Sequence, residues 1–290
     1  GNAPATERRE SAPRGASTKR CRMNRWTLFD DEAMSGAENM ARDEFLLARL
    51  ESGGGAPAFR LYSFSPPALT LGFHQDPARV LDLDAVREDG VDLVRRITGG
   101  RALLHDGELT YCIAWPLGDG GLGGGLQETF IRISQAIVDA LVALGVDAEL
   151  ASGRSYGREP GMVSPCLVST SRHEVAIGGR KIVGSAQRRT KKAVLQHGSI
   201  LLTDASTRIA RYLEGDWEGL EAAVTNVSAE TGKAADAGRL RRELVRAFGR
   251  RFDVDWTAGS LREAEEREIA RLADLKRGEF RIPAGGEETR

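Results

Sequence analysis

Cys166 and Lys181 are the two residues whose types and spacing point most directly to chemistry. The lysine follows the cysteine by fifteen positions, within the run GRKIVG. A cysteine attacks an acyl group as the thiolate, and a nearby ammonium lowers the thiol pKa from about 8.5. An ammonium also stabilises the oxyanion that forms when a carbonyl is attacked. The pair predicts covalent acyl transfer, with Cys166 as nucleophile and Lys181 lowering its pKa and polarising the carbonyl.

A free cysteine is more often a small buried hydrophobe than a nucleophile. Cys166, however, ends a Ser-Pro-Cys sequence within a polar, glycine-rich stretch, which is typical of a loop rather than a core. Cys112 lies in an apolar run and is expected to pack in the core. The loop setting therefore favours Cys166 as the reactive thiol.

A second group of candidates surrounds two glycines in the segment RRITGGRALLH. Gly99 and Gly100 let the backbone approach a ligand closely and present N–H groups to it, and Thr98 precedes them. Arg96 provides a positive charge, and His105 provides a side chain that titrates near neutral pH. The set would suit a carboxyl-derived or phosphate oxygen. The competing interpretation is an ordinary turn with solvated arginines.

The sequence from 174 to 186 predicts a hairpin, because two adjacent glycines supply the positive φ angles of a tight turn. Lys181 would then lie on the returning strand. Ser185 and Gln187 would share its face by period-two alternation, so that they could line an acyl pocket. Gly184 would leave room for an alkyl chain.

His105 and His197 both lie within the motif segments of the chain. Either histidine could accept a proton from an incoming amine. A structural hydrogen bond to a loop carbonyl explains each of them equally well. The sequence leaves this choice open.

A basic cluster follows the hairpin and comprises Arg188, Arg189, Lys191 and Lys192. Most runs of this kind are solvated surface. Acidic carrier domains would nevertheless be attracted to such a patch by charge complementarity. Docking of a carrier protein is therefore a hypothesis for these four residues.

The composition excludes several broad classes. Forty-one basic residues balance forty-two acidic ones among 290 residues, so no overall field favours nucleic acid or a membrane surface. Three scattered cysteines without C-x-x-C spacing argue against a zinc site and suit a reducing cytoplasm. No run approaches the roughly 20 apolar residues of a membrane span.

Hydrophobic periodicity predicts an α+β fold. Residues 1–22 are expected to be a disordered tail, and residues 23–290 a single catalytic domain with a helical C-terminal portion from about 205 to 290. Further helices are expected around 34–50 and at 126–144. Strands of one sheet are expected at 59–64, 68–72, 91–97 and 109–115, with another at 193–202.

Taken in order, the motifs resemble the lipoate and biotin protein ligase superfamily. They are PPALTLGFHQ from position 66, RRITGGRALLHDGELTYCI from 95, SPC from 164, GGRKIVGSAQRR from 178 and LQHGSILL from 195. The chain is most similar to the cysteine-dependent octanoyltransferases that use the glycine-cleavage carrier protein. Four such blocks in order are far more specific than any one of them.

The resemblance implies a mixed, mainly antiparallel sheet flanked by helices, with an acyl tunnel between the Gly-Gly loop and the GRK strand. It implies octanoyl transfer from acyl carrier protein through a thioester on Cys166 to a lysine of a lipoyl-domain protein, the glycine-cleavage H protein. Lys181 matches the lysine that lowers the pKa of that cysteine. No metal or cofactor, nucleic acid or membrane is implied, and the setting is cytoplasmic.

Three other functions remain open. An ATP-dependent lipoate ligase shares the arginine, Gly-Gly and GRK-like elements, but this chain has Glu108-Leu109-Thr110-Tyr111 where ligases carry a Gly-Asn element. A transferase that uses a lipoyl-domain donor would look the same in sequence. A non-catalytic lipoyl- or acyl-binding protein would be expected to have lost Cys166 or Lys181, and both are present.

Overall fold

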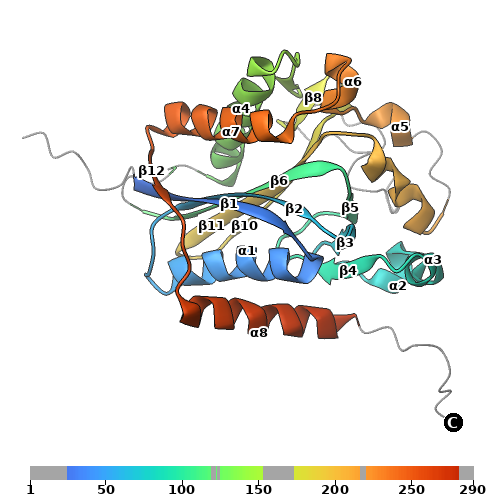
Figure 1. The fold of residues 1–290 in the computed structure, drawn as a ribbon, viewed down its shortest axis with the longest axis horizontal. Helices are drawn as coiled ribbons and strands as arrows, with labels where there is room; N and C mark the ends of the chain where they lie inside the picture. The colour runs from blue at the N-terminus through green and yellow to red at the C-terminus, as the bar shows by residue number, and fades with distance from the viewer. Residues whose placement is uncertain (1–24, 119–121, 123–124, 153–172, 216–219, 281–290) are drawn as a thin grey trace, which may run out of the picture.

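The computed structural model describes residues 25–118, 122, 125–152, 173–215 and 220–280. A six-stranded sheet lies at the centre of these residues, and its place in the fold can be followed in Figure 1. Its strands, in spatial order, are β10 (Val183–Arg189), β11 (Ala193–Leu201), β6 (Glu108–Pro116), β2 (Ala58–Phe64), β1 (Arg25–Met34) and β12 (Asp255–Ala258). In this order, neighbouring strands are antiparallel from the first to the fourth and parallel from the fourth to the sixth. The sheet is thus mixed and mainly antiparallel, which confirms the predicted fold class.

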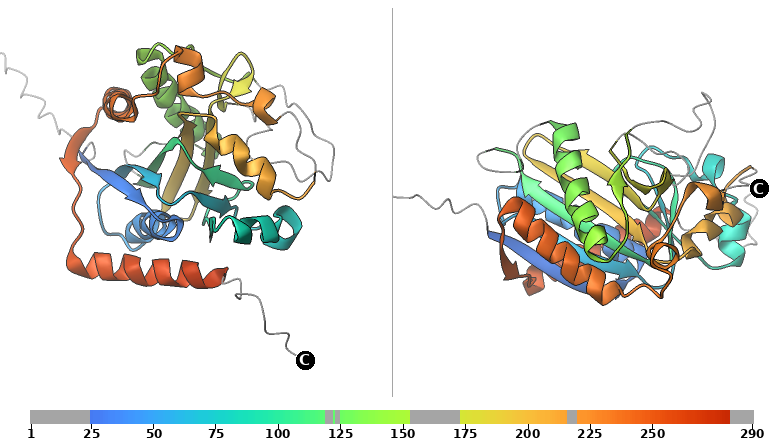
Figure 2. Two further views of the ribbon diagram at one scale, coloured as in Figure 1. Left: turned by 45° about the vertical axis from the view of Figure 1, so that its right-hand side comes forward. Right: turned by 90° about the horizontal axis from the view of Figure 1, so that it is seen from above.

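Helices cover both faces of this sheet (Figure 1). On one face lie α4 (Leu126–Ala143) and α7 (Ala237–Phe252), which Figure 2 shows from above, lying across the strands. On the other face lies α1 (Gly36–Glu51), with α8 (Glu263–Glu279) packed against its outer side. The main core is formed where the apolar side chains of the sheet meet those of α4 and α7, and it includes Phe59, Ile113, Ile137, Ile200 and Phe248.

Local sequence explains why α1 begins and ends where it does. The Ser35 side chain accepts a hydrogen bond from the Glu38 N–H, and the Glu38 carboxylate accepts one from the Ser35 N–H, which forms a capping box. Met40 and Leu47 are buried one and three turns further along. Asp43 lies between them at helical spacing and is buried as well. The helix therefore carries a carboxylate on its core-facing side.

The strands β3 (Ala68–Leu71), β4 (Asp92–Arg95) and β5 (Leu103–His105) form a separate three-stranded sheet. The prediction that the strands at 68–72 and 91–97 join those at 59–64 and 109–115 in one sheet is wrong, and β5 was not predicted. Their apolar side chains belong to a second cluster, completed by the short helices α2 (Pro77–Val80) and α3 (Leu83–Glu88). Alternation in a sequence shows which side chains are buried, but it does not show which strand is the partner.

The hairpin around the two glycines is confirmed, but it is shorter than predicted. The strand β8 (Val175–Ile177) pairs with β9 (Arg180–Lys181), and Gly178 and Gly179 have φ angles of 54° and 82° at the turn. The two-residue strand β7 (Glu149–Leu150) completes this third sheet. Ile182 then carries the chain into β10, so that Lys181 and Ser185 lie on different strands and the alternation expected between them is interrupted.

The C-terminal portion contains the expected helices and one strand that the periodicity did not indicate. The 3-10 helix η1 (Ala205–Tyr212) and the short helices α5 (Leu220–Ala223) and α6 (Val227–Thr231) lead into α7. After α7, β12 pairs in parallel with β1 at the edge of the central sheet. In α8, Lys276 forms an ion pair of 2.7 Å with Glu44 of α1. None of the helices among the described residues combines the length and apolar character needed to span a bilayer.

Candidate active site

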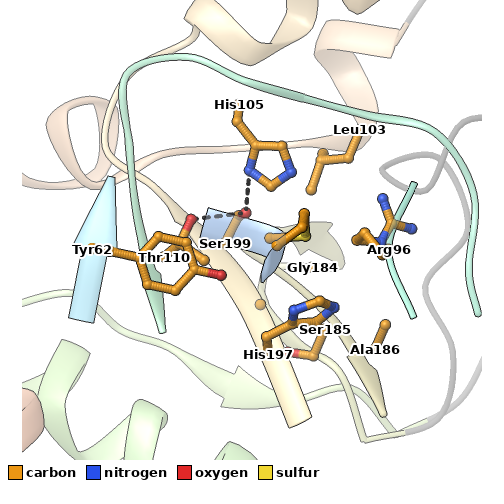
Figure 3. A pocket seen from close by; sticks show the side chains of 12 residues that line it. Tyr62, Arg96, Leu103, His105, Thr110, Gly184, Ser185, Ala186, His197 and Ser199 are labelled. Carbon is orange, nitrogen blue, oxygen red and sulfur yellow. Dashed lines mark hydrogen bonds between the residues drawn. The ribbon is translucent and has the colours of Figure 1, made fainter. Parts of the chain in front are cut away.

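A pocket, here called the central pocket, lies beside β10 and β11 on the α1 side of the sheet (Figure 3). It contains about 330 Å³ of empty space, part of which is open to solvent. β10, β11, α1 and the three-stranded sheet of β3, β4 and β5 contribute to its lining, so that segments far apart in sequence meet there. The lining residues are Met40, Tyr62, Arg96, Leu103, His105, Thr110, Gly184, Ser185, Ala186, His197, Gly198 and Ser199.

Lys181 is not among the lining residues of the central pocket, but it lies beside one of them, Gly184. Its side chain is only 1% exposed, and its Nζ lies 2.9 Å from Glu174 Oε1. A Cβ atom placed on Gly184, which lines the pocket, would lie 3.8 Å from the Lys181 Cε and would have no other neighbour within 4 Å. The lysine stem therefore borders the open space that the absence of a side chain at Gly184 leaves.

Register along β11 shows how the pocket is oriented. The Ile182 carbonyl accepts a hydrogen bond of 3.0 Å from the Leu201 N–H, which places Lys181 near the C-terminal end of β11. Ser199 pairs with Gly184, and His197 pairs with Ala186 two residues further from that end. Two strand residues span roughly 7 Å. Figure 3 shows His105 and His197 at opposite ends of the lining, with Ser199 on the His105 side.

Cys166 and the rest of the Ser-Pro-Cys sequence lie outside the described residues, as does the expected 1–22 tail. The described residues on either side of the cysteine segment meet each other. The His173 N–H donates to the Ala151 carbonyl at 3.0 Å, and the Ala151 N–H donates to the Glu174 carbonyl at 2.8 Å. The described residues before and after the cysteine segment are therefore close to Glu174, the partner of Lys181.

The Gly-Gly loop is held in place by Arg96. One guanidinium nitrogen donates to the Thr70 carbonyl at 2.8 Å, and the other donates to the Gly99 and Arg101 carbonyls at 3.3 and 2.9 Å. Gly100 has a φ of 96°, a conformation that favours glycine, and its backbone approaches Gly72 closely. Arg96 lines the pocket while its charge is distributed over the loop that it supports.

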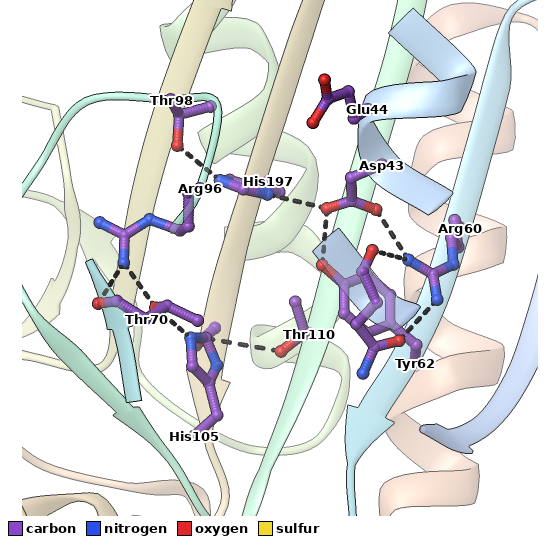
Figure 4. A network of polar contacts seen from close by, with 12 residues as sticks. Asp43, Glu44, Arg60, Tyr62, Thr70, Arg96, Thr98, His105, Thr110 and His197 are labelled. Atoms are coloured by element: carbon purple, nitrogen blue, oxygen red, sulfur yellow. Dashed lines mark hydrogen bonds and ion pairs between the residues drawn. The ribbon is translucent and has the colours of Figure 1, made fainter. Parts of the chain in front are cut away.

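His197 bonds through both ring nitrogens. Its Nδ1 lies 2.8 Å from Asp43 Oδ2, and its Nε2 lies 2.7 Å from the Thr98 hydroxyl (Figure 4). Burial lowers the pKa of His197 more than the neighbouring carboxylate raises it. The imidazole is therefore neutral near pH 7, with its Nδ1–H donating to Asp43 and its Nε2 accepting from Thr98. This network ties the Gly-Gly loop to α1.

Asp43 is the centre of a buried polar network that extends to β2 (Figure 4). It accepts hydrogen bonds from Arg60 Nη1 at 2.8 Å and from the Tyr62 hydroxyl at 2.7 Å. Burial alone would raise the pKa of Asp43, but the hydrogen bond from His197 and the charge of Arg60 outweigh it, so that the pKa lies below its usual value. The carboxylate is ionised and fixes the orientation of His197.

His105 occupies the other end of the pocket, beside Ser199. Its Nε2 lies 2.7 Å from the Thr70 hydroxyl, and its Nδ1 lies 3.2 Å from the Ser199 hydroxyl and also contacts Glu108. Glu108 in turn accepts a hydrogen bond of 2.7 Å from Thr110. His105 and Glu108 are thus a buried pair at the same end of the pocket as Lys181.

Ser185 and Gln187 lie on the face of β10 opposite to His197, and their side chains form hydrogen bonds there. The Ser185 hydroxyl lies 2.7 Å from the Tyr111 hydroxyl, and Gln187 donates to Gln196 at 3.1 Å. Ser185 is among the lining residues, whereas Gln187 is not. Because β10 begins after Ile182, it is Gly184 and Ala186 that share the face of His197.

The basic cluster is divided between two roles. Arg188 donates to the Ile97 carbonyl at 2.8 Å and lies over the Phe73 ring, so that it helps to hold the segment before the Gly-Gly loop. Arg189, Lys191 and Lys192 are exposed at the end of the β10–β11 hairpin. Of the four cluster residues, these three are the exposed ones, and Lys192 Nζ also donates to the Glu51 carbonyl at 3.1 Å.

The sequence did not indicate Asp43, Arg60 or Glu174 as residues of the site. It also did not indicate that the Glu108 carboxylate would be the partner of His105. Asp43 had a recognisable signal, since it shares helical spacing with the buried Met40 and Leu47. Arg60 interrupts an apolar strand, which is a second signal. Their pairing could not be read from the chain, because it depends on how α1 docks against β2.

Comparison with known proteins places these features in a family. A model of the lipoyl protein ligase A/B catalytic domain matches residues 35–249. The octanoyltransferase LipM of Moorella thermoacetica is 37% identical over 259 residues, which cover 87% of this chain and 94% of that protein. The LipM octanoyltransferase of Clostridioides difficile is 30% identical over 266 residues, which cover 89% and 98%.

Solved structures show the same fold. A lipoate-protein ligase A bound with ATP superposes with a TM-score of 0.72 at 25% identity, covering 88% of this chain and 96% of that one. A putative lipoate protein ligase from T. acidophilum with bound lipoic acid gives a TM-score of 0.70 at 25% identity and the same coverage. Both are relatives in fold.

The chain therefore belongs to the lipoyl protein ligase A/B catalytic domain family. Within that family, curated relatives that cover 86–89% of this chain are named octanoyltransferases, and they support an octanoyltransferase role in lipoate biosynthesis. The chain is accordingly an acyltransferase.

Proposed function

We propose that the chain transfers an octanoyl group from acyl carrier protein to Cys166, and from Cys166 to a lysine of a lipoyl-domain protein, the glycine-cleavage H protein. The observation that supports this proposal is a buried lysine whose Nζ is paired with Glu174 and whose stem lies beside Gly184 of the central pocket. An ammonium in that position can stabilise both a thiolate and a carbonyl oxyanion.

In the first half of the reaction, the Cys166 thiolate attacks the carbonyl carbon of the octanoyl thioester. A new C–S bond forms, and the bond to the sulfur of the carrier breaks, so that the carrier leaves as its thiol after protonation. The enzyme thioester keeps the reactivity of the donor, which suits a mechanism without nucleotide. In the second half, the amine of the acceptor attacks the same carbonyl and Cys166 is released.

The central pocket would hold the alkyl chain. The carbonyl would lie at the Lys181 end, where Gly184 leaves open space, and the chain would extend along β11 toward His197 and Met40. Both lining histidines are hydrogen-bonded to threonines outside the lining, in the pairs Thr98–His197 and Thr70–His105. They therefore present mainly carbon atoms to the cavity, which is favourable for an apolar ligand.

Carrier docking would use Arg189, Lys191 and Lys192, because acyl carrier and lipoyl domains are acidic as a class. These exposed charges lie at the tip of the hairpin whose strands form the pocket. Rim charges of this kind act mainly on the rate of association. Arg188 would contribute less, since it is bound to the Ile97 carbonyl.

Intact-mass spectrometry after mixing the protein with octanoyl carrier, without ATP, tests the proposal. We expect one octanoyl adduct on the wild-type protein and none on Cys166→Ala. Cys112→Ala is the matched control, since burial raises the pKa of that thiol well above its usual value and the adduct should be retained. Lys181→Met should acylate about 10²- to 10³-fold more slowly.

The same measurement distinguishes ligation from transfer. Octanoate with ATP should leave the protein and its acceptor unmodified. ATP-dependent modification of a lipoyl domain that persists in Cys166→Ala would show that the chain is a ligase. Comparing glycine-cleavage H protein with other lipoyl domains as acceptors would then identify the preferred partner.

A further inference from the structure

A second cavity, here called the acidic cavity, is also lined by His105. It contains about 550 Å³ of empty space, part of which is open to solvent. Its walls include Asp106 from the β5–β6 turn, Glu108 at the start of β6, and Leu202 and Thr203, which follow the end of β11. His105 lines both this cavity and the central pocket, so that the two spaces share this residue as part of their walls.

Glu108 has an incomplete set of partners in this cavity. Its Oε1 accepts a hydrogen bond from Thr110 and contacts His105 Nδ1. Its Oε2 is buried and has no hydrogen-bond partner among the described residues. Leaving one oxygen of a buried carboxylate without a donor costs free energy, so such a group calls for an explanation in a native protein. Asp106, by contrast, is paired with Arg208.

The acidic cavity lies at the reactive end of the central pocket. Leu202 and Thr203 directly follow the β11 residue whose N–H donates to the Ile182 carbonyl, next to Lys181. Ser199, which lies 3.2 Å from His105 Nδ1, pairs with Gly184. A group that reaches Glu108 through the acidic cavity is therefore beside the end of the central pocket where the thioester carbonyl would lie. The His197 end of the central pocket is the opposite one.

The chemistry of the second half-reaction indicates what such a group must be. A lysine side chain has a pKa near 10.4, so that roughly one molecule in 2,500 carries the neutral, nucleophilic amine at pH 7. The central pocket is unsuited to receive the ammonium, because its described lining residues include the cationic Arg96 but no carboxylate. A buried carboxylate with a free oxygen can bind the ammonium and accept its proton.

We propose that the acidic cavity admits the lysine side chain of the acceptor, and that Glu108 Oε2 binds its ammonium and removes a proton. The proposal rests on the transferase function above and assigns the base of its second step. His105 is a positioning residue, because its contact with Oε1 holds the carboxylate with Oε2 directed away from it. The substrate class is a primary alkylamine on an acidic protein.

The protons and bonds of this step balance without a further reactant. The ammonium gives one proton to Glu108, and the neutral nitrogen attacks the thioester carbonyl, forming a C–N bond. Collapse of the adduct breaks the C–S bond, and the second nitrogen proton is transferred to the leaving cysteine sulfur. The amide then departs, and Glu108 releases its proton to water through the open part of the cavity.

Single-turnover kinetics with acyl-enzyme prepared in advance test the assignment. We expect Glu108→Gln to slow transfer to a lipoyl domain about 100-fold or more at pH 7. The rate of the variant should rise by up to about tenfold per pH unit as the free amine becomes more abundant, so that the deficit shrinks at high pH. Glu268→Gln, an exposed change on α8, is the matched control and should transfer like the wild type.

Hydroxylamine, which is already neutral at pH 7, separates a base from a structural group. It should remove the octanoyl group from the variant and from the wild type at rates within about twofold. Wild-type transfer rates in Glu108→Gln, or an equal loss with hydroxylamine and with the lipoyl domain, would overturn the proposal. Failure of the wild-type protein to form an acyl-enzyme at all would instead contradict the transferase function itself.

Discussion

Lys181 Nζ lies 2.9 Å from Glu174 Oε1, and the two side chains are only 1% and 8% exposed. Glu174 immediately precedes β8, and Lys181 ends β9, so that the pair spans the hairpin formed by these two strands. A buried ammonium requires a partner, because an isolated buried charge is strongly unfavourable. The sequence around the two glycines thus forms a hairpin whose closing contact also gives the proposed catalytic lysine a carboxylate partner.

Glu174→Gln should destabilise the protein substantially. The substitution leaves the Lys181 ammonium buried without its carboxylate, and breaking one side of a buried pair typically costs about 3–5 kcal/mol. Urea unfolding, followed by circular dichroism, measures the free energy of unfolding. Glu263→Gln is the control, because its pair with Arg267 is exposed and should contribute less than about 1 kcal/mol. Equal losses in both variants would contradict the importance of burial here.

The His197–Asp43 pair predicts how stability depends on pH. The folded-state pKa of His197 is lowered from 6.5, so that the unfolded chain binds a proton at this residue at a pH where the folded protein does not. The free energy of unfolding should therefore fall as the pH drops below 6.5, by up to about 1.4 kcal/mol per pH unit from this one group. The lowered pKa of Asp43 adds a second loss that begins near 3.8.

His197→Gln should remove the first of these losses. Unfolding free energies measured between pH 7.5 and 5 should show a shallower slope in the variant than in the wild type, whatever the absolute stability. His74→Gln changes an exposed histidine and should keep the wild-type slope. An unchanged slope in His197→Gln would mean that the imidazole is protonated in the folded protein.

Motif spacing identified five of the twelve residues that line the central pocket, namely Arg96, Gly184, Ser185, His105 and His197. Short motifs succeed because each one lies on a single strand or turn. Gln187 is different, since the expected alternation assumed one continuous strand from Lys181 onward. Ile182 instead passes the chain from one sheet to another, a change of partner that period-two patterns do not encode.

The polar network behind the pocket could not be predicted for a related reason. Asp43 and Arg60 are separated by 17 residues and lie on a helix and a strand. Each looks unusual in its own segment, as a charged residue at a buried position, but their pairing depends on the docking of α1 over β2. The packing of α8 on α1 likewise follows from the β12 strand, which has only four residues and no strong alternation.

Gly184 is expected to control the length of acyl chain that the central pocket accepts. A Cβ at this position would meet only the Lys181 Cε, at an ordinary contact distance of 3.8 Å, so Gly184→Val should fold while filling the pocket. Octanoyl adduct formation should fall at least tenfold, and acetyl or butyryl transfer should be less affected. Gly198→Ala provides the contrast, since its Cβ would lie 2.6 Å from the Gly184 carbonyl and should destabilise the sheet.

Reversing the charge of Arg189, Lys191 and Lys192 should weaken the productive encounter with the acidic carrier. The triple change to Glu should raise the apparent KM for octanoyl carrier several-fold at low ionic strength, with little change in kcat, because rim charges act mainly on association. The effect should fade as salt is raised above about 0.15 M, where the Debye length is near 8 Å.

The matched control is a triple change to Glu at Arg246, Arg250 and Arg267, which alters the net charge equally on other surfaces. A small thioester such as octanoyl-pantetheine should react at the same rate with all three proteins, since it has no acidic surface to dock. If the control variant raises the KM as much as the hairpin variant does, net charge rather than a docking patch governs the encounter, and the carrier must approach the central pocket by another face.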